Sequence, residues 1–162
     1  MNVPREKIAQ ALFSLLANQQ TGVNSNIPES LQQVARIQKF FRRGKMFSNI
    51  PPGELPVLVL LHLAEEAAEP QAFGLQQWTL RFHAVVLLRA DAGRDTEVDT
   101  VCNAILDAVD ATLAAGEPGS YGQQTLGGLV QNAWIEGMLT IEQETIQQPI
   151  AISIPIRCLT GQ

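Results

Sequence analysis

Residues 77–89 read QWTLRFHAVVLLR, an alternation of apolar and polar side chains that predicts a long β-strand. The large apolar residues share one face of this strand: Trp78, Leu80, Phe82, Ala84, Val86 and Leu88. The other face carries Thr79, Arg81, His83 and Arg89. A strand with one apolar face and one mixed face is typical of an antiparallel sheet that is covered by helices on one side.

Four further segments predict strands on either side of this one: 34–43 (VARIQKFFRR), 56–66 (PVLVLLHLAEE), about 130–142, and 149–159 (PIAISIPIRCL). The β-branched and leucine-rich run at 56–66 indicates a strand that is buried on both faces. In the last strand, Ile150, Ile152, Ile154, Ile156 and Cys158 share one face. Pro155 cannot donate a ladder hydrogen bond, so this strand is expected at a sheet edge or at a bulge.

Two amphipathic helices complete the pattern. The first begins at Pro4 and ends in the polar run 18–22, and a polar connection is predicted over about 23–33. The second lies within 91–116, is capped by Asp95 or Thr96, and ends at Gly116. Its apolar stripe is expected to bury both Ile105 and Leu106 against the sheet.

The fold class predicted is therefore α+β, with a mostly antiparallel sheet and two amphipathic helices on one face, in the order α-β-β-β-α-β-β. The 162 residues are expected to form a single domain, 1–162, because 46% hydrophobic residues suffice for one core. The charged fraction of 17% is below the roughly 25% of typical soluble domains. A thin charge coat of this kind indicates that other subunits cover part of the surface.

The residues offer little catalytic chemistry, so we expect no enzyme activity, no cofactor and no metal site. The HLAEE run, residues 62–66, has no second histidine and is interpreted as a strand end turning into solvent. Cys102 and Cys158 are interpreted as core residues. The TLGGL run, residues 125–129, lacks the glycines of a nucleotide-binding loop and predicts a turn. No secretory signal and no membrane-length apolar run is found, so a cytoplasmic protein is expected.

The net charge of −5 excludes a uniformly basic nucleic-acid binder but allows a local basic patch. Five of the eleven Lys and Arg residues fall within ten positions around Phe40 and Phe41: Arg36, Lys39, Arg42, Arg43 and Lys45. This cluster is either a solvated strand edge, a docking patch for an acidic partner, or a nucleic-acid site. The acidic residues of the second helix could complement it between subunits or could form a solvated helix face: Asp95, Glu97, Asp99, Asp107 and Asp110.

Four blocks carry a resemblance to a known family: REKIAQALFSLL (5–16), QQWTLRFHAVVLL (76–88), TLGGLVQNAWIEG (125–137) and IAISIPIRCL (150–159). With these blocks the chain resembles the tail terminator proteins of long-tailed bacteriophages, the lambda-type minor tail protein U family. The resemblance covers most of the chain in the same element order, and block 125–137 is its most specific part. The stretches QTGVNSNIPESL (20–31) and MFSNIPPGELP (46–56) are particular to this chain.

The resemblance implies a structural virion protein with no catalytic residues. Such proteins form a homohexameric ring on the last ring of tail tube protein, stop polymerisation, and offer a surface to a head-completion or connector protein. Genomic DNA crosses the channel without specific binding, and the location is the head-proximal end of the tail after assembly in the host cytoplasm. The loops Gly44–Leu55 and Ala68–Gln76 are the expected contact surfaces, because loops vary without disturbing a core. The alternatives are a neck or head-completion protein, and a small nucleic-acid-binding regulator that uses residues 36–45.

Overall fold

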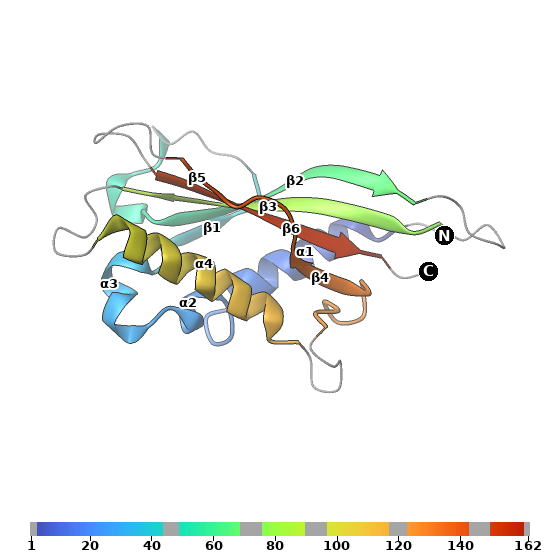
Figure 1. Cartoon of the computed structure of the whole chain (residues 1–162), viewed down its shortest axis with the longest axis horizontal. Helices are drawn as coiled ribbons and strands as arrows, with labels where there is room; N and C mark the ends of the chain where they lie inside the picture. Colours follow the sequence, from blue (N-terminus) through green and yellow to red (C-terminus); the bar gives the residue numbers. More distant parts are fainter. Residues whose placement is uncertain are drawn as a thin grey trace.

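The fold is α+β, with a six-stranded mixed sheet whose helices all lie on one face (Figure 1). This computed structural model describes residues 3–43, 49–68, 76–89, 97–116, 123–142 and 150–160. The predicted fold class and the placement of helices on a single face are confirmed, whereas the predicted element order is matched in part.

The sheet runs in the order β1-β2-β3-β6-β4, and β5 also pairs with β6. Its strands are β1 (Lys39–Phe41), β2 (Val57–Ala67), β3 (Trp78–Leu88), β4 (Asn132–Ile135), β5 (Thr140–Glu142) and β6 (Ile150–Leu159). The pair β1–β2 is parallel and every other described pair is antiparallel. The strands β3 and β6, predicted with the clearest alternation, thus lie side by side at the centre of the sheet.

Two long helices, α1 (Arg5–Ala17) and α4 (Val98–Ala114), pack below the sheet with the short helices α2 (Val23–Asn26) and α3 (Gln32–Ala35) (Figure 1). Short 3-10 turns lie at Glu29–Leu31 and Pro52–Glu54. Helix α4, the second of the two predicted helices, begins at Val98, with Glu97 in the capping position and no side-chain cap. The predicted caps Asp95 and Thr96 lie outside the described residues.

The polar connection predicted at 23–33 contains helical turns that the prediction did not include: α2, a 3-10 turn and the start of α3. The buried amide of Asn24 organises it: Nδ2 donates to the Ile37 carbonyl at 2.9 Å, and Oδ1 accepts from the Ile37 N–H at 2.8 Å. Such side-chain bonds to distant backbone leave no periodic signal in the sequence.

The strand predicted at 34–43 shrinks to Lys39–Phe41 for a related reason. Residues 34 and 35 belong to α3, and Asn24 already holds both backbone polar groups of Ile37. Sheet pairing therefore begins after Ile37, with Gln38 donating to the Pro56 carbonyl and Lys39 opposite Val57.

The strand predicted over about 130–142 is divided into β4 and β5, which pair with the same edge of β6. Ile135 lies opposite Ile156, and Thr140 lies opposite Ser153. Residues 136–139 therefore face residues 154–155, and the two extra residues form a bulge larger than the ordinary two-against-one kind. Gly137 adopts a φ of 123° there, a conformation that other residues rarely take.

Pro155 faces this bulge, which is one of the two positions predicted for it, a sheet edge or a bulge. Its carbonyl accepts the Glu136 N–H at 3.1 Å. The N and C=O groups of one strand residue point to the same side, so the proline nitrogen also faces the bulge, where no ladder bond is needed. The strand β6 itself is internal, with β3 on its other side.

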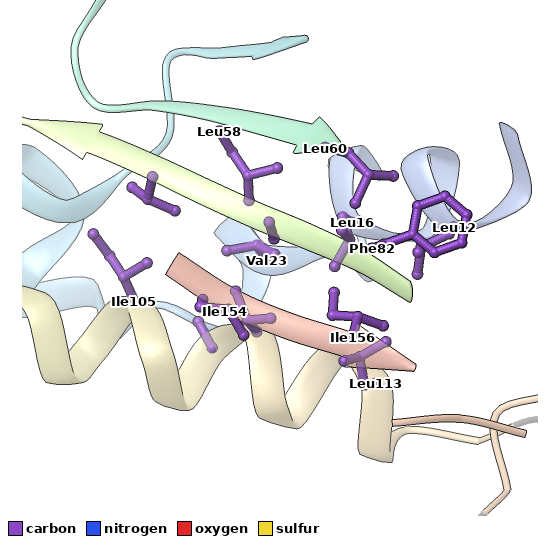
Figure 2. Close-up of a cluster of buried hydrophobic side chains, with 14 of the residues drawn as sticks. Leu12, Leu16, Val23, Leu58, Leu60, Phe82, Ile105, Leu113, Ile154 and Ile156 are labelled. Carbon is purple, nitrogen blue, oxygen red and sulfur yellow. The ribbon is translucent and has the colours of Figure 1, made fainter. Parts of the chain in front are cut away.

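The core lies between the sheet and the helices (Figure 2). The predicted inner faces of β3 and β6 are confirmed by full burial of Leu80, Phe82, Ala84, Val86, Leu88, Ile150, Ile152, Ile154, Ile156 and Cys158. Trp78, at the start of β3, is half-buried. In β2 burial on both faces extends over residues 57–60, and the strand beyond them is largely exposed, so that part of its prediction is wrong. A register shift in the β2–β3 pairing lies between His62 and Ala64, within this exposed half.

In α4 the buried stripe includes Val101, Cys102, Ile105, Val109 and Leu113. Ile105 is fully buried, as predicted, but Leu106 is half-buried at the margin of the core, so its prediction is wrong. One residue advances a helix by 100°, which moves Leu106 from the centre of the stripe to its edge.

Candidate interaction surface

The predicted basic cluster lies at one edge of the sheet, which is formed by the terminal strand β1. Arg36, Lys39, Arg42 and Arg43 are all exposed; Lys45 lies outside the described residues. Arg36 donates to the side chains of Gln19 and Gln32, at 3.1 and 3.3 Å. The cluster is therefore a surface feature of the α3–β1 segment, which all three interpretations of it require.

Arg42 differs from its neighbours because it has an acidic partner. Its Nη1 and Nη2 donate to the two carboxylate oxygens of Glu6 in α1, at 2.7 and 3.1 Å. The hydrogen bond from Arg42 lowers the pKa of Glu6, and the same bond raises the pKa of Arg42. Within the described part of the chain, Lys39 and Arg43 have no such ion pair. These two cations remain available to a partner.

The acidic residues expected on the second helix are exposed where they are described: Glu97, Asp99, Asp107 and Asp110. Asp95 lies outside the described residues. Of the two expected contact loops, residues 44–48 and 69–75 are likewise outside them.

The opposite edge of the sheet carries an apolar surface that the sequence reasoning missed. Met138 and Leu139 in the bulge, and Ile141 in β5, are 81%, 44% and 45% exposed. Glu136 precedes this group and the exposed Glu142 follows it. The apolar character of 138–141 fitted a buried strand, so the pattern gave no sign of exposure. Gly137, as a breaker inside a strand pattern, was the available signal for a bulge.

A set of polar contacts anchors the base of this bulge. Arg157 on β6 binds Glu136, and its guanidinium lies over the Trp134 ring, 5.4 Å from the ring centroid. Trp134 also donates its indole N–H to Glu136 at 2.8 Å. Burial opposes the charge on Glu136, but the hydrogen bonds from Arg157 and Trp134 outweigh it and lower the pKa of this carboxyl. These contacts hold the residue that precedes the exposed apolar group against β4 and β6.

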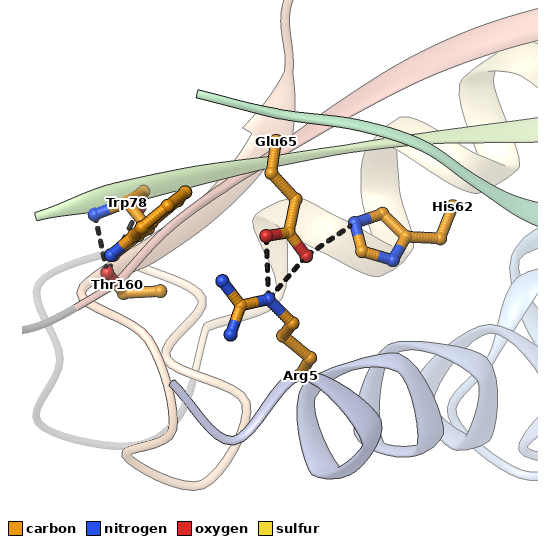
Figure 3. Close-up of polar contacts among 5 residues, drawn as sticks. All are labelled: Arg5, His62, Glu65, Trp78 and Thr160. Atoms are coloured by element: carbon orange, nitrogen blue, oxygen red, sulfur yellow. Dashed lines mark hydrogen bonds and ion pairs between the residues drawn. The ribbon is translucent and has the colours of Figure 1, made fainter. Parts of the chain in front are cut away.

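The HLAEE run lies in the largely exposed end of β2, as predicted, and its Glu65 also forms a structural junction with α1 (Figure 3). Arg5 of α1 donates its Nε–H to both carboxylate oxygens of Glu65, at 2.7 and 2.6 Å. His62 contacts the same carboxylate at 3.3 Å and stacks on Phe82. The Arg5 guanidinium also lies over the Trp78 ring. These contacts hold the beginning of α1 against the end of β2 and the beginning of β3.

The backbone of Trp78 is held in turn by Thr160 (Figure 3). Its N–H donates to the threonine hydroxyl at 2.9 Å, and that hydroxyl donates to the Trp78 carbonyl at 3.0 Å. Within the described ranges, no group of three or more His, Cys, Asp or Glu side chains could hold a metal ion.

Both cysteines are buried core residues, as predicted. Burial raises the pKa of the Cys158 thiol to about 12. Burial, together with the charge of Asp99, also raises the pKa of Cys102. Neither sulfur is therefore in the thiolate form that nucleophilic chemistry requires near neutral pH.

A shallow cleft of about 300 Å³ lies between α1, the end of α4 and the predicted turn at 125–129, with Gln124 just before it. Its lining has no ionisable side chain: Ala11, Ser14, Leu15, Asn18, Thr21, Ala115, Gln124, Leu126 and Gly127. The turn is confirmed, with positive φ angles at Leu126, Gly127 and Gly128. The lining offers no acid–base pair for catalysis.

No protein-family model matches the chain, and no curated protein matches it. Among the helices in the described ranges, none has the length and apolar character needed to cross a membrane.

Proposed function

We propose that this chain is a structural virion protein that caps the end of a phage tail tube as a ring. The supporting observation is that its four family-like blocks form one contiguous unit in the fold. Block 5–16 lies in α1, and the other blocks supply the adjacent strands β3, β6 and β4. The resemblance therefore concerns a packed unit of structure and not scattered matches.

The edges of the sheet suit a closed ring. A ring of identical subunits needs two different, complementary surfaces on each subunit. In the described part of the chain, β1 and the β4–β5 edge each lack a neighbouring strand on their outer side. One edge is basic and the other is apolar with acidic flanks.

The ring would meet tail tube protein on one face and a head-completion or connector protein on the other. It would be assembled in the host cytoplasm as a hexamer and stay at the head-proximal end of the tail. Genomic DNA would cross its channel without specific binding, so the basic residues 36–43 belong at a subunit edge and away from the channel wall. No catalytic role and no cofactor enter this proposal.

Electron microscopy of particles that lack the protein tests the proposal. Tail tubes of uncontrolled, excessive length are expected, because nothing then stops the addition of tube subunits. Tails of normal length without heads would instead assign the protein to the neck. A salt-dependent shift of DNA by the purified protein, with tails unaffected, would favour the nucleic-acid-binding regulator.

A further inference from the structure

We propose that the protruding edge, residues 138–142, docks against the basic edge, residues 39–43, of a second copy of this chain. This contact would join subunits head to tail. The inference rests on the proposed ring, and it assigns the two surfaces that close it.

The protruding edge is rich in large apolar side chains, as a protein interface is, but these side chains are exposed to solvent in the single chain. Three of its residues, Met138, Leu139 and Ile141, are large, apolar and 44–81% exposed. Grouped apolar side chains of this kind mark interaction sites in soluble proteins. Methionine suits such a site because its flexible thioether adapts to the surface it meets.

The protrusion is held in place before any partner arrives. The contacts of Glu136 with Arg157 and Trp134 fix its base, and the Glu136 N–H binds the Pro155 carbonyl. A preorganised surface loses little conformational entropy on binding.

The basic edge supplies the complementary chemistry. Lys39 and Arg43 are exposed and lack an ion pair within the described residues. Phe40, between them, is half-buried and packs against the core. Glu142 on the protruding edge is exposed and likewise lacks an ion pair in the described part. Opposite charges at the rim of an apolar contact set its orientation and register.

A second copy explains both edges at once. A nucleic acid on residues 39–43 would neutralise the cations but leave Met138 and Leu139 in water. Because the two edges lie at opposite ends of the strand order, the contact is heterologous and repeats from copy to copy until the ring closes. The bulge interrupts the edge and keeps continuous strand pairing from extending across the contact.

The first test substitutes Met138→Asp and compares it with Leu63→Asp. Leu63 is also apolar, 56% exposed and in a strand with a register shift, but it lies on β2. We expect Met138→Asp to weaken self-association by about tenfold or more in sedimentation velocity, because a charge would enter the apolar contact. Leu63→Asp should associate as the unchanged chain does. Circular dichroism confirms that both variants fold, and equal association of both would overturn the inference.

The second test exchanges the charges. Lys39→Glu with Arg43→Glu should abolish association, and adding Glu142→Lys should restore part of it, since opposite charges would again face each other. Lack of any recovery would contradict the pairing of these edges. Salt-dependent DNA binding that is lost in the Lys39→Glu, Arg43→Glu variant would also overturn it, in favour of a nucleic-acid site.

The third test separates this inference from the proposed function. A chain with both Lys39→Cys and Met138→Cys is oxidised, on its own and in phage lysates, and compared with each single variant. A ladder of linked subunits is expected for the double variant alone, because Cys102 and Cys158 are buried. If particles lacking the protein have overlong tails but the double variant gives no ladder, the edges are wrong and the function stands. If the ladder forms and the tails are normal, the contact stands and the function is wrong.

Discussion

The backbone N–H of Glu136 binds the carbonyl of Pro155 at 3.1 Å, at the point where β4 stops pairing with β6 and β5 has not yet begun. A proline inside a central strand leaves a gap in the ladder of hydrogen bonds. The adjacent segment of the same chain, between β4 and β5, forms a bulge at this gap. The same bulge carries Met138 and Leu139 out of the sheet. The feature that accommodates the proline thus also creates the exposed apolar surface.

Replacing Gly137 by Ala tests this bulge. A Cβ at Gly137 would lie 3.3 Å from the Pro155 ring, in a backbone with φ of 123°. We expect a loss of about 1–3 kcal/mol in the free energy of unfolding, measured by urea denaturation. Gly53→Ala is the control, because nothing lies within 4 Å of its Cβ position. Equal stability of the two variants would contradict the bulge geometry.

The margin of the core can be tested with neighbouring residues of α4. Ile105→Ala should reduce the free energy of unfolding by about 2–5 kcal/mol, because it removes fully buried methyl groups. Leu106→Ala should cost clearly less, because that side chain is half-buried at the edge of the core. Chemical denaturation of both variants gives the comparison, and a greater loss at Leu106 would mean that the helix faces the sheet differently.

The anchoring of Glu136 predicts a pH dependence. Its pKa lies below the ordinary value of 4.5 in the folded chain, so its contribution to stability is complete above that pH and is lost as the pH falls through the folded-state pKa. Glu136→Gln should therefore lower the urea midpoint at neutral pH, and the difference from the unchanged chain should shrink on acidification. Glu142→Gln is the matched control and should change the midpoint little. A difference that grows toward acid would contradict the assignment.

The cysteines predict slow thiol chemistry. Because burial raises the pKa of Cys158 to about 12 and also raises that of Cys102, neither should react with a thiol reagent in the folded protein near neutral pH. Both should react fully in denaturant. Mass spectrometry after brief alkylation gives the readout, and rapid labelling of native protein would show that the core opens readily.

The proposed ring predicts that charge reversal at the basic edge disturbs phage assembly. Arg42→Glu with Arg43→Glu should leave the subunit folded, since exposed charges contribute little to a fold. It should impair ring formation or docking on the tail, because like charges at a contact spoil its register. Complementation of a phage that lacks the protein is the assay, with Glu6→Gln as a control for loss of the Arg42 partner. Normal titre and tail length would return these arginines to the role of solvated edge charges.

Local periodicity determined much of this fold. The alternation of residues 77–89 and 150–158 marked the buried faces of β3 and β6, and the helical stripes located α1 and α4. These signals are readable because one backbone geometry repeats along each element, so the side chains that meet the core recur at fixed intervals. The exposure of Arg36, Lys39, Arg42 and Arg43 also followed from the sequence, because grouped charges stay in solvent.

Tertiary structure decided the rest, through contacts between residues far apart in the chain. Asn24 occupies the backbone of Ile37 and shortens β1, and Arg5 draws Glu65 into a junction with α1. Opposite Pro155, the strand predicted over about 130–142 is divided into β4 and β5, and Met138 between them is exposed. No repeat in the sequence reports such pairs, because each depends on which elements the complete fold brings side by side.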